Sequence, residues 1–453
     1  MINFDGKKVA VIGAGIEGTS TLKYLSKYKT QTFLLEQKDE WKIDAETRKL
    51  TESLNTRLSF GKNYLDALEK FDVIFRSPSV RPDLPQLVQA KKSGALITSQ
   101  TKLFFDLCKA PIIGITGTKG KGTTSSLLYE MLGVSGRKVF LAGNIGNPPL
   151  EVVEQITENS LVILELSSFQ LIDLEKSPNI AVVLMVTSEH LDWHKNTDEY
   201  INAKKKIVEN QNEKDTAVIS NDYPMSKKIG EAANGQKYYF STKTEIANGA
   251  YYKEGKIVLN TKDKIEQIDI TGTSLLGEHN LENICAAALV AKLLDLTKNE
   301  IEKGIVGFKG LPHRLEFVRQ VNEVRYYNDS ASTIPETAIA AINAFKQPKV
   351  LILGGSSKNS DFSTLGKVIV DSNVSTLILI GQEANRIKDV VASAGFSGLL
   401  VEGLRDMKEI VTKASEVAKT GEVVVLSPAC ASFGIFKNYQ DRGEQFKKAV
   451  NGL

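Results

Sequence analysis

The sequence has 453 residues, with 57 lysines and arginines against 54 aspartates and glutamates and a net charge of +3. The overall charge therefore gives no sign of nucleic-acid or membrane binding, and no apolar run approaches the length of a membrane span. The length exceeds one hydrophobic core, so we expect about three domains. The three cysteines are scattered and no signal peptide precedes the first strand, so we expect a cytoplasmic protein.

Residues 1–98 are predicted to form a Rossmann-like domain. An apolar strand at 9–12 leads into the glycine-rich turn 13–18 and a helix, and the next strand ends at Glu36. This Gly-x-Gly-x-x-Gly spacing with a following acid is the dinucleotide-binding fingerprint, which serves NAD and other diphosphates. An NAD-dependent oxidoreductase is an alternative that rests on this fingerprint alone. Ser77 follows a further strand, where either a ligand site or a plain Ser-Pro loop is expected.

Residues 99–311 are predicted to form a central P-loop ATPase-like domain. An apolar strand at 112–115 runs into a glycine-rich loop, and a helical pattern follows. Glycine lets backbone N–H groups turn onto a polyphosphate, and the helix N-terminus adds partial positive charge. Lys121 can then reach the β- and γ-phosphates, and the hydroxyl of Thr123 can bind Mg²⁺. The predicted ATP-binding loop comprises Gly117, Thr118, Lys119, Gly120, Lys121, Gly122, Thr123 and Thr124.

This loop relaxes the strict P-loop motif, because Ile115 stands where that motif has its first glycine. A tight turn with an incidental lysine is therefore the alternative. Its glycines and threonines nevertheless agree with the strand before them and the helix after them, which favours a phosphate site.

Polar residues end the next two central strands. Glu165 follows an apolar strand at 161–164, and His190 follows a strand at 180–186. A carboxylate at a strand end beside a phosphate loop is placed to hold Mg²⁺. A helix-capping or surface role is the alternative for each.

Later central segments add further candidates. Lys204 lies in a lysine run on the helix 198–210, where we expect two of the three lysines to face solvent. Alternating segments over 250–270 predict a small antiparallel sheet beside the parallel one. Asn280 and Asn283 stand one helical turn apart, so both amides could face one ligand.

Residues 312–453 are predicted to form a second Rossmann-like domain. Strands at 349–353, 377–380 and 422–426 each end in small or polar residues. This pattern describes a doubly wound sheet with a site along one edge. Lys358 and Ser432 would meet an anion there.

Four motifs, taken in order, resemble the Mur ligase family over the whole chain. They are residues 143–146 (Gly-Asn-Ile-Gly), 165–171 (Glu-Leu-Ser-Ser-Phe-Gln-Leu), 310–314 (Gly-Leu-Pro-His-Arg) and 426–432 (Leu-Ser-Pro-Ala-Cys-Ala-Ser). The resemblance implies a three-domain α/β fold and an ATP- and Mg²⁺-dependent ligase of peptidoglycan precursor synthesis. ATP would phosphorylate the carboxylate of UDP-N-acetylmuramoyl-L-alanine, and the amine of D-glutamate would attack the acyl phosphate.

The resemblance also implies roles for individual residues. Lys121 would stabilise the transferring phosphoryl group. Thr123, Glu165, His190 and Lys204 would hold Mg²⁺, with Lys204 carbamylated. Asn144, Asn280, Asn283, Arg314 and Asp329 would bind ATP. Thr333, Lys358, Ser432 and Tyr439 would bind the incoming amino acid. Gly15, Ile16, Glu17, Glu36, Gln37, Lys38, Ser77 and Asn144 would bind the UDP-substrate.

Departures from the family pattern leave alternatives open. Gly122 stands where the family usually has a hydroxyl residue. This loop sequence also resembles that of folylpolyglutamate synthases. The N-terminal Rossmann-like domain argues against a folate substrate. Ala331 replaces a usual lysine and Tyr439 a usual phenylalanine, so L-glutamate or another amino acid remains an alternative. A nucleotide-binding module without turnover is a further one, against which Glu165, His190 and Lys204 stand. We expect small-molecule substrates, no nucleic acid, no membrane insertion and a monomer.

Overall fold

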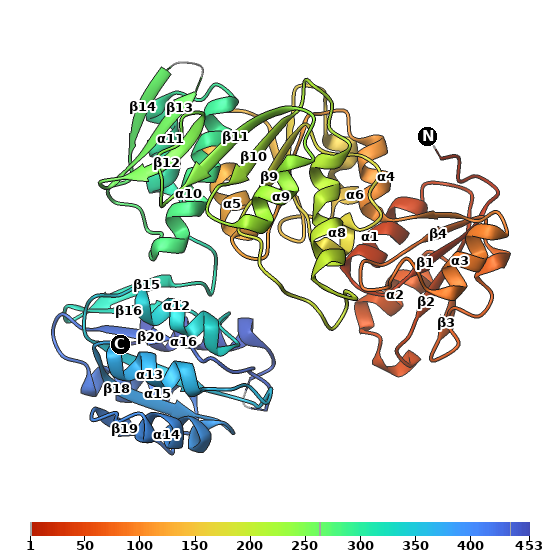
Figure 1. Ribbon diagram of the computed structural model, residues 1–453. Coiled ribbons are helices and arrows are strands. Elements are labelled where there is room, and N and C mark those ends of the chain that lie inside the picture. Colours follow the sequence, from red (N-terminus) through yellow and green to blue (C-terminus); the bar gives the residue numbers. More distant parts are fainter. Residues whose placement is uncertain (1, 262–263, 435) are drawn as a thin grey trace. The chain divides into compact units, whose positions relative to one another are not determined.

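The computed structural model describes residues 2–261, 264–434 and 436–453, and within these ranges the strands form three sheets (Figure 1). The chain divides into two compact units. One comprises the residues up to 269 together with 282–305, and the other comprises 270–281 and 306–453. The first unit holds two of the sheets and the second unit holds the third. The predicted three-domain α/β fold is confirmed, while the boundaries after residues 98 and 311 stay predictions.

The N-terminal sheet is parallel and has the strand order β3-β2-β1-β4-β5. Its strands are β1 (Lys8–Ile12), β2 (Gln31–Glu36), β3 (Arg57–Phe60), β4 (Val73–Phe75) and β5 (Leu96–Thr98), and its helices are α1 (Ile16–Leu25), α2 (Ala45–Ser53) and α3 (Pro85–Lys92). Val9 and Val11 of β1 pack in one core cluster and Ala10 and Ile12 in another, because successive side chains of a strand face opposite sides. The strand order reverses between β1 and β4, which places the ligand crevice of such a sheet at their carboxyl ends.

The central sheet has the order β14-β13-β12-β11-β10-β9-β6-β8-β7. Its strands are β6 (Ile112–Thr116), β7 (Val139–Gly143), β8 (Leu161–Glu165), β9 (Ile180–Val183), β10 (Thr216–Ser220), β11 (Gln236–Ser241), β12 (Gly249–Lys253), β13 (Lys256–Thr261) and β14 (Lys264–Asp269). Its helices are α4 (Gln100–Leu107), α5 (Lys121–Val134), α6 (Pro149–Val152), α7 (Ser168–Leu171), α8 (Thr197–Glu209), α9 (Pro224–Glu231), α10 (Glu278–Leu293) and α11 (Lys298–Gly307). Strand β6, which precedes the glycine loop, is buried along its whole length between β8 and β9.

The antiparallel strands of this region differ from the sequence expectation in one respect. They do not form a sheet of their own, because β12 pairs in parallel with β11 and the antiparallel β13 and β14 then extend the same sheet. Among the described residues, no helix combines the length and the apolar character that crossing a membrane requires.

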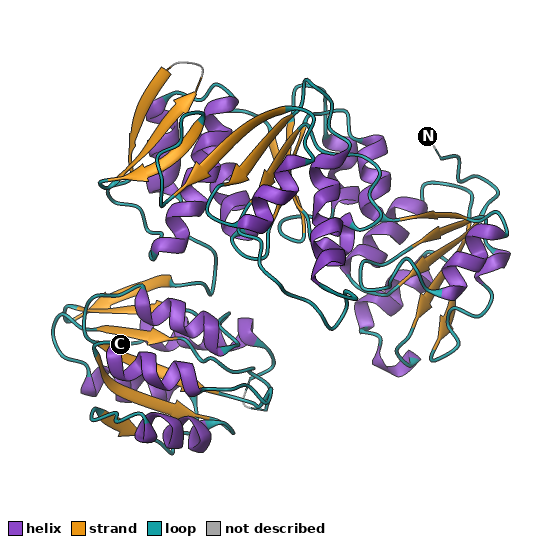
Figure 2. Cartoon of the chain, in the orientation of Figure 1, coloured by secondary structure: helices purple, strands orange, loops and turns teal. Residues whose placement is uncertain are grey.

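The C-terminal sheet has the order β15-β16-β20-β17-β18-β19, with only β15 antiparallel to its neighbour among the described strands. Its strands are β15 (Glu316–Val321), β16 (Val324–Asn328), β17 (Lys349–Gly354), β18 (Val374–Ile380), β19 (Leu399–Val401) and β20 (Val423–Leu426). Its helices are α12 (Pro335–Asn343), α13 (Ser363–Asp371), α14 (Ala384–Ser393), α15 (Met407–Val417) and α16 (Tyr439–Asn451). Helices cover both faces of this sheet (Figure 2). Two separate apolar clusters pack against it.

Candidate active site

The glycine loop between β6 and α5 is tightly packed and has a conformation that favours glycine. Gly120 has a φ of +87°, and a Cβ atom there would lie 2.3 Å from Oδ1 of the buried Asn283. A Cβ atom at Gly117 would lie 2.9 Å from the Cβ of Leu184, next to the end of β9. Both positions therefore require glycine. Gly120 is the N-cap of α5 and makes no side-chain capping bond, and the N-terminus of a helix favours an anion.

Two lysines converge on one carbonyl of this loop. Nζ of Lys121 donates to the carbonyls of Gly117 and Thr118, at 3.0 and 3.1 Å. Nζ of Lys204, from α8, donates to the same Gly117 carbonyl at 2.9 Å and to Oγ1 of Thr116 at 3.3 Å. The amino groups of both lysines therefore lie at the end of β6, beside the glycine loop.

Burial sets the protonation of Lys204. Its side chain is 1% exposed, and Nζ lies 4.8 Å from the centre of the Tyr200 ring. Desolvation, followed by the charge of Lys121, holds the pKa of Lys204 well below its usual 10.5. A neutral amine is the nucleophilic form of lysine and the form that carbon dioxide carbamylates. Its neighbours Lys205 and Lys206 are half-buried and pair with Glu209, so they lie on the more solvated face, as predicted.

Glu165 ends the strand next to the loop strand. It is 8% exposed, and it lies opposite Ile115 of β6 on one side and Gly143 of β7 on the other. A Cβ atom at Gly143 would lie 2.3 Å from the Glu165 carbonyl oxygen, and that oxygen accepts from the N–H of Asn144 at 3.2 Å. The Gly-Asn-Ile-Gly turn thus packs on the end of β8 and places the exposed Asn144 beside Glu165.

His190 lies in the loop between β9 and α8. It has a φ of +58°, an exposed side chain, and a ring centre 5.0 Å from that of Phe169 on α7. Its Nε2 atom lies 3.6 Å from a carboxylate oxygen of Glu189. The α7 segment that follows Glu165 and the loop that carries His190 are therefore neighbours.

The N-terminal glycine turn has a different set of partners. Oε2 of Glu36 accepts from the N–H of Ala14 at 2.8 Å, and Oε1 accepts from the N–H of Lys38 at 2.9 Å. A Cβ atom at Gly13 would lie 3.2 Å from the Cβ of Ser77, so the predicted UDP-substrate turns meet at the β1/β4 switch point. Gly15 caps α1 without a side-chain bond, Ile16 is 76% exposed, and Gln37 and Lys38 are exposed.

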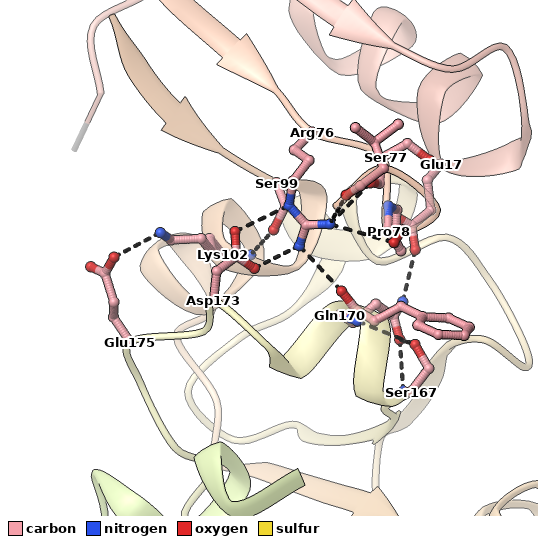
Figure 3. Close-up of polar contacts among 12 residues, drawn as sticks. Glu17, Arg76, Ser77, Pro78, Ser99, Lys102, Ser167, Gln170, Asp173 and Glu175 are labelled. Carbon is pink, nitrogen blue, oxygen red and sulfur yellow. Dashed lines mark hydrogen bonds and ion pairs between the residues drawn. The ribbon is translucent and has the colours of Figure 1, made fainter. Parts of the chain in front are cut away.

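Glu17 points toward the central sheet. Its Oε1 atom accepts from Nε2 of Gln170 at 2.7 Å, as Figure 3 shows. Burial raises the pKa of Glu17 above its usual 4.5. Gln170 also closes a capping box with Ser167 at the start of α7. A contact of Glu17 with a diphosphate stays a prediction, since its carboxylate is already engaged by Gln170.

The second unit brings the predicted amino-acid residues together in part. Nζ of Lys358 donates to Oγ1 of Thr333 at 3.3 Å. An isolated bridge between Ser356 and Ala431 joins the Lys358 loop to the segment of the buried Ser432. Tyr439 begins α16 and is half-exposed, with its ring edge-on to His313 at 5.9 Å.

Asp329 is engaged inside this unit. Its carboxylate accepts from Oγ of Ser332 and Ser427, at 2.5 and 2.7 Å, and from the N–H of Leu315 at 3.1 Å. Burial raises the pKa of Asp329 to about 6. Arg314 is exposed nearby in sequence. A contact of either residue with adenosine stays a prediction.

Comparisons with known proteins cover the chain from end to end. A MurD-like N-terminal domain of Mur ligases matches residues 7–99, a Mur ligase middle domain matches 115–291, and a Mur ligase glutamate ligase domain matches 313–430. A UDP-N-acetylmuramoylalanine–D-glutamate ligase of Acetivibrio thermocellus is 39% identical over 99% of this chain and 97% of its own. The chain belongs to the Mur ligase family. An enzyme of the same name from Clostridium novyi is 40% identical over the same shares.

Solved Mur ligase structures share the fold. The MurF ligase of Thermotoga maritima in complex with ADP superposes with a TM-score of 0.58 at 18% identity, covering 99% of this chain and 96% of that one. The likeness confirms the α/β architecture of this Mur ligase.

The residues around the phosphate loop fit magnesium with ATP. Among the described residues, no group of three or more His, Cys, Asp or Glu side chains is arranged to hold a metal by itself. Mg²⁺ prefers oxygen ligands, keeps several waters and takes few protein ligands beside substrate phosphates. The Glu165 carboxylate and the half-buried Thr123 hydroxyl offer such oxygens next to the anion-binding end of α5. A carbamate on Lys204 would add another.

Some of the predicted ATP-binding residues make hydrogen bonds within the protein. Thr124 is buried, and its hydroxyl donates to Oδ1 of Asn283 at 3.1 Å, so it braces the loop from behind. Asn280 and Asn283 stand one turn apart on α10, and Nδ2 of Asn280 donates to the Leu276 carbonyl at 2.6 Å. A ligand shared by the two amides stays a prediction.

Two buried residues escaped the sequence analysis. Oη of Tyr200 lies 2.8 Å from Oγ1 of Thr118, which ties α8 to the loop, and burial raises the pKa of Tyr200 to about 12. Arg442 is buried in the second unit and donates to Ser330 and to the Cys430 carbonyl, bracing both loops near Ser432. These two residues are distinguished only by the burial of their polar side chains, and local sequence does not predict that burial.

Proposed function

We propose that this Mur ligase joins D-glutamate to UDP-N-acetylmuramoyl-L-alanine, with conversion of ATP to ADP and phosphate, in peptidoglycan precursor synthesis. The observation that carries the proposal is the 39% identity, over nearly the full length of both chains, to a ligase that is named for this activity. The position of Lys121 at the glycine loop, where its Nζ donates to the carbonyls of Gly117 and Thr118, supports it, because a triphosphate requires positive charge nearby.

The first step forms a bond between a carboxylate oxygen of the UDP-substrate and the γ-phosphorus, and breaks the bond from that phosphorus to ADP. Lys121 compensates the negative charge that spreads over the phosphoryl oxygens, and the N–H groups at the start of α5 hold the β-phosphate. Mg²⁺, held by Thr123, Glu165, His190 and a carbamate on Lys204, would neutralise phosphate charge. In the second step the glutamate amine attacks the acyl carbon, loses a proton, and phosphate leaves.

The two organic substrates would be held by opposite parts of the chain. The carboxyl edge of the N-terminal sheet suits a nucleotide. It is lined by Gly15, Ile16, Ser77 and the segment from Glu36 to Lys38. Asn144 lies beside Glu165, where the acid to be activated would end. Lys358, with Thr333 and Ser432, supplies a cation and hydroxyl groups suited to the carboxylates of glutamate. We propose a cytoplasmic monomer that acts on small molecules.

One alternative keeps the chemistry and changes the amino acid. Ala331 and Tyr439 differ from the usual residues near the amino-acid loops, so L-glutamate is the second candidate.

A ligation assay with D- and L-glutamate in parallel, scored by product mass, tests the proposal. We expect the dipeptide product with D-glutamate only, and ADP release that requires both organic substrates. Product with L-glutamate alone would establish the alternative, and ADP release independent of both substrates would refute ligase activity.

A further inference from the structure

The segment 76–83, which follows β4, reaches out of the N-terminal sheet through two arginines. Arg76 is 2% exposed, and its Nη2 and Nε atoms lie 2.6 and 3.2 Å from the Asp173 carboxylate, just beyond α7 (Figure 3). Nη2 also donates to the Phe169 carbonyl at 3.2 Å. On its other side, Nη1 donates to the carbonyls of Ser77 and Val80, at 3.0 and 2.8 Å. One guanidinium thus holds the Ser77 turn and the α7 segment together.

Arg81 makes a second link, to the loop of His190. Nη1 and Nη2 contact the two carboxylate oxygens of Glu199, in the first turn of α8, at 3.0 and 2.9 Å. Nη1 also donates to the Trp193 carbonyl, and the guanidinium lies 5.0 Å from the centre of the Trp193 ring. Nε1 of Trp193 donates back to the Ser79 carbonyl at 2.9 Å.

These anchor points flank the proposed magnesium ligands. Helix α7 begins three residues after Glu165, and Trp193 lies three residues after His190. Helix α8, whose first turn Arg81 holds, carries Lys204. Bidentate guanidinium–carboxylate pairs fix orientation as well as distance. A buried ion pair adds little net stability after desolvation, so its main physical effect here is on geometry.

We propose that Arg76 and Arg81 are positioning residues for the ligase reaction, an inference that rests on the proposed function. They join the Ser77 turn, which would hold the UDP-substrate, to the segment that follows Glu165 and to the loop that carries His190. The acid delivered by the N-terminal sheet is thereby kept in line with the phosphate loop. A displacement of about 1 Å at the reacting atoms costs on the order of 10²-fold in rate.

The test compares Arg76→Lys and Arg81→Lys with the control Arg57→Lys. Arg57 belongs to β3 of the same sheet, where its guanidinium lies over the Phe33 ring at 5.3 Å. Lysine keeps the charge but cannot make the bidentate contact. We expect kcat to fall about 10- to 100-fold in each of the two variants, with the KM for ATP within about threefold of the parent. The control should keep the parent kcat.

Trp193 provides a readout that a purely structural role would not change. In a Trp41→Phe background it is the remaining tryptophan of the chain. We expect UDP-N-acetylmuramoyl-L-alanine to shift its emission in the parent. In Arg81→Lys the shift should be lost, although calorimetry still detects binding of the same compound.

The possible outcomes distinguish a failure of this inference from a failure of the proposed function. Lysine variants that melt like the parent and keep its kcat and its Trp193 response would overturn the inference. If Arg76→Lys fails to fold, Arg81→Lys decides alone, because its side chain is partly solvated. A parent that forms no product would refute the proposed function and this inference with it, whereas an active parent with fully active variants would refute the inference only.

Discussion

The two glycine-rich turns of the first unit have the same strand–turn–helix design but opposite electrostatics. In the N-terminal turn, the Ala14 N–H is taken by the Glu36 carboxylate, and Glu17 occupies the first turn of α1. In the central loop, Lys121 begins α5 and Lys204 reaches the same loop from α8. Backbone shape alone would suit phosphate in both places. The carboxylates at the N-terminal turn and Lys121 at the central loop support our proposal that the triphosphate binds at the central loop.

The sharpest way to break this contrast is to remove the cation at the start of α5. We expect Lys121→Ala to lower kcat by about 10³-fold, because the transferring phosphoryl group loses its compensating charge. Measurement of product formation, together with circular dichroism, checks this. The exposed Lys138→Ala, in the same sheet region, is the control and should be active. Parent-like activity in a folded Lys121→Ala would contradict the assignment of the triphosphate to this loop.

Lys204 should cost stability while it supports activity. Its pKa is lowered on folding, so between the native pKa and 10.5 the unfolded chain binds more protons at this site than the native protein. This penalty shrinks as the pH rises toward 10.5. We therefore expect Lys204→Met to lower kcat by about 10²-fold and to unfold at a higher temperature than the parent near neutral pH.

Thermal melts across pH measure this, with the half-buried Lys205→Met as the matched control. The advantage of Lys204→Met should fade as the pH approaches 10.5. An advantage that stays constant with pH would mean that Lys204 is not the group that titrates.

The substitution Gly120→Ala tests the shape of the central loop rather than its charge. An alanine there must adopt a φ of +87° and would displace Asn283, which braces Thr124. The strain alone is about 1–2 kcal/mol, and we expect the KM for ATP to rise about tenfold. Gly133→Ala on α5 meets nothing within 4 Å and should leave the KM unchanged. Equal ATP affinity in both variants would show that the loop does not contact nucleotide.

The smallest effect belongs to the N-terminal turn. Burial raises the pKa of Glu17, so the native protein holds its proton more tightly than the unfolded chain, and the ionised carboxylate costs stability above that pKa. Glu17→Gln keeps an acceptor for Gln170 and should melt slightly above the parent at neutral pH, with no gain below pH 4.5. Its KM for ATP should be unchanged. A large rise in the KM for ATP would indicate that ATP binds at the N-terminal turn and would contradict the proposal.

Local sequence predicted much of the fold. The β-branched runs of β1 and β6, each followed by glycine, gave the strand–turn–helix units at nearly their observed positions. The continuation of β12–β14 into the central sheet was not predictable, because alternation reveals a strand but not the partner it pairs with.

The candidate site was predictable where a residue type carries its own chemistry. Lys121 and Glu165 follow from their places after buried strands. The burial of Lys204, among three adjacent lysines, follows only from how α8 packs against Thr116 and Gly117. Three contacts join residues about a hundred positions or more apart: the hydrogen bond of Thr124 to Asn283 and the ion pairs of Arg76 and Arg81. No local sequence pattern encodes such contacts.

Oxygen transfer from the acid tests the account most directly. UDP-N-acetylmuramoyl-L-alanine labelled with ¹⁸O in its carboxylate is incubated with ATP, D-glutamate and the protein, and the released phosphate is examined by mass spectrometry. Activation of the acid by the γ-phosphoryl group at the Lys121 loop predicts one carboxylate oxygen in each phosphate. Phosphate that carries no label, formed alongside product, would contradict it.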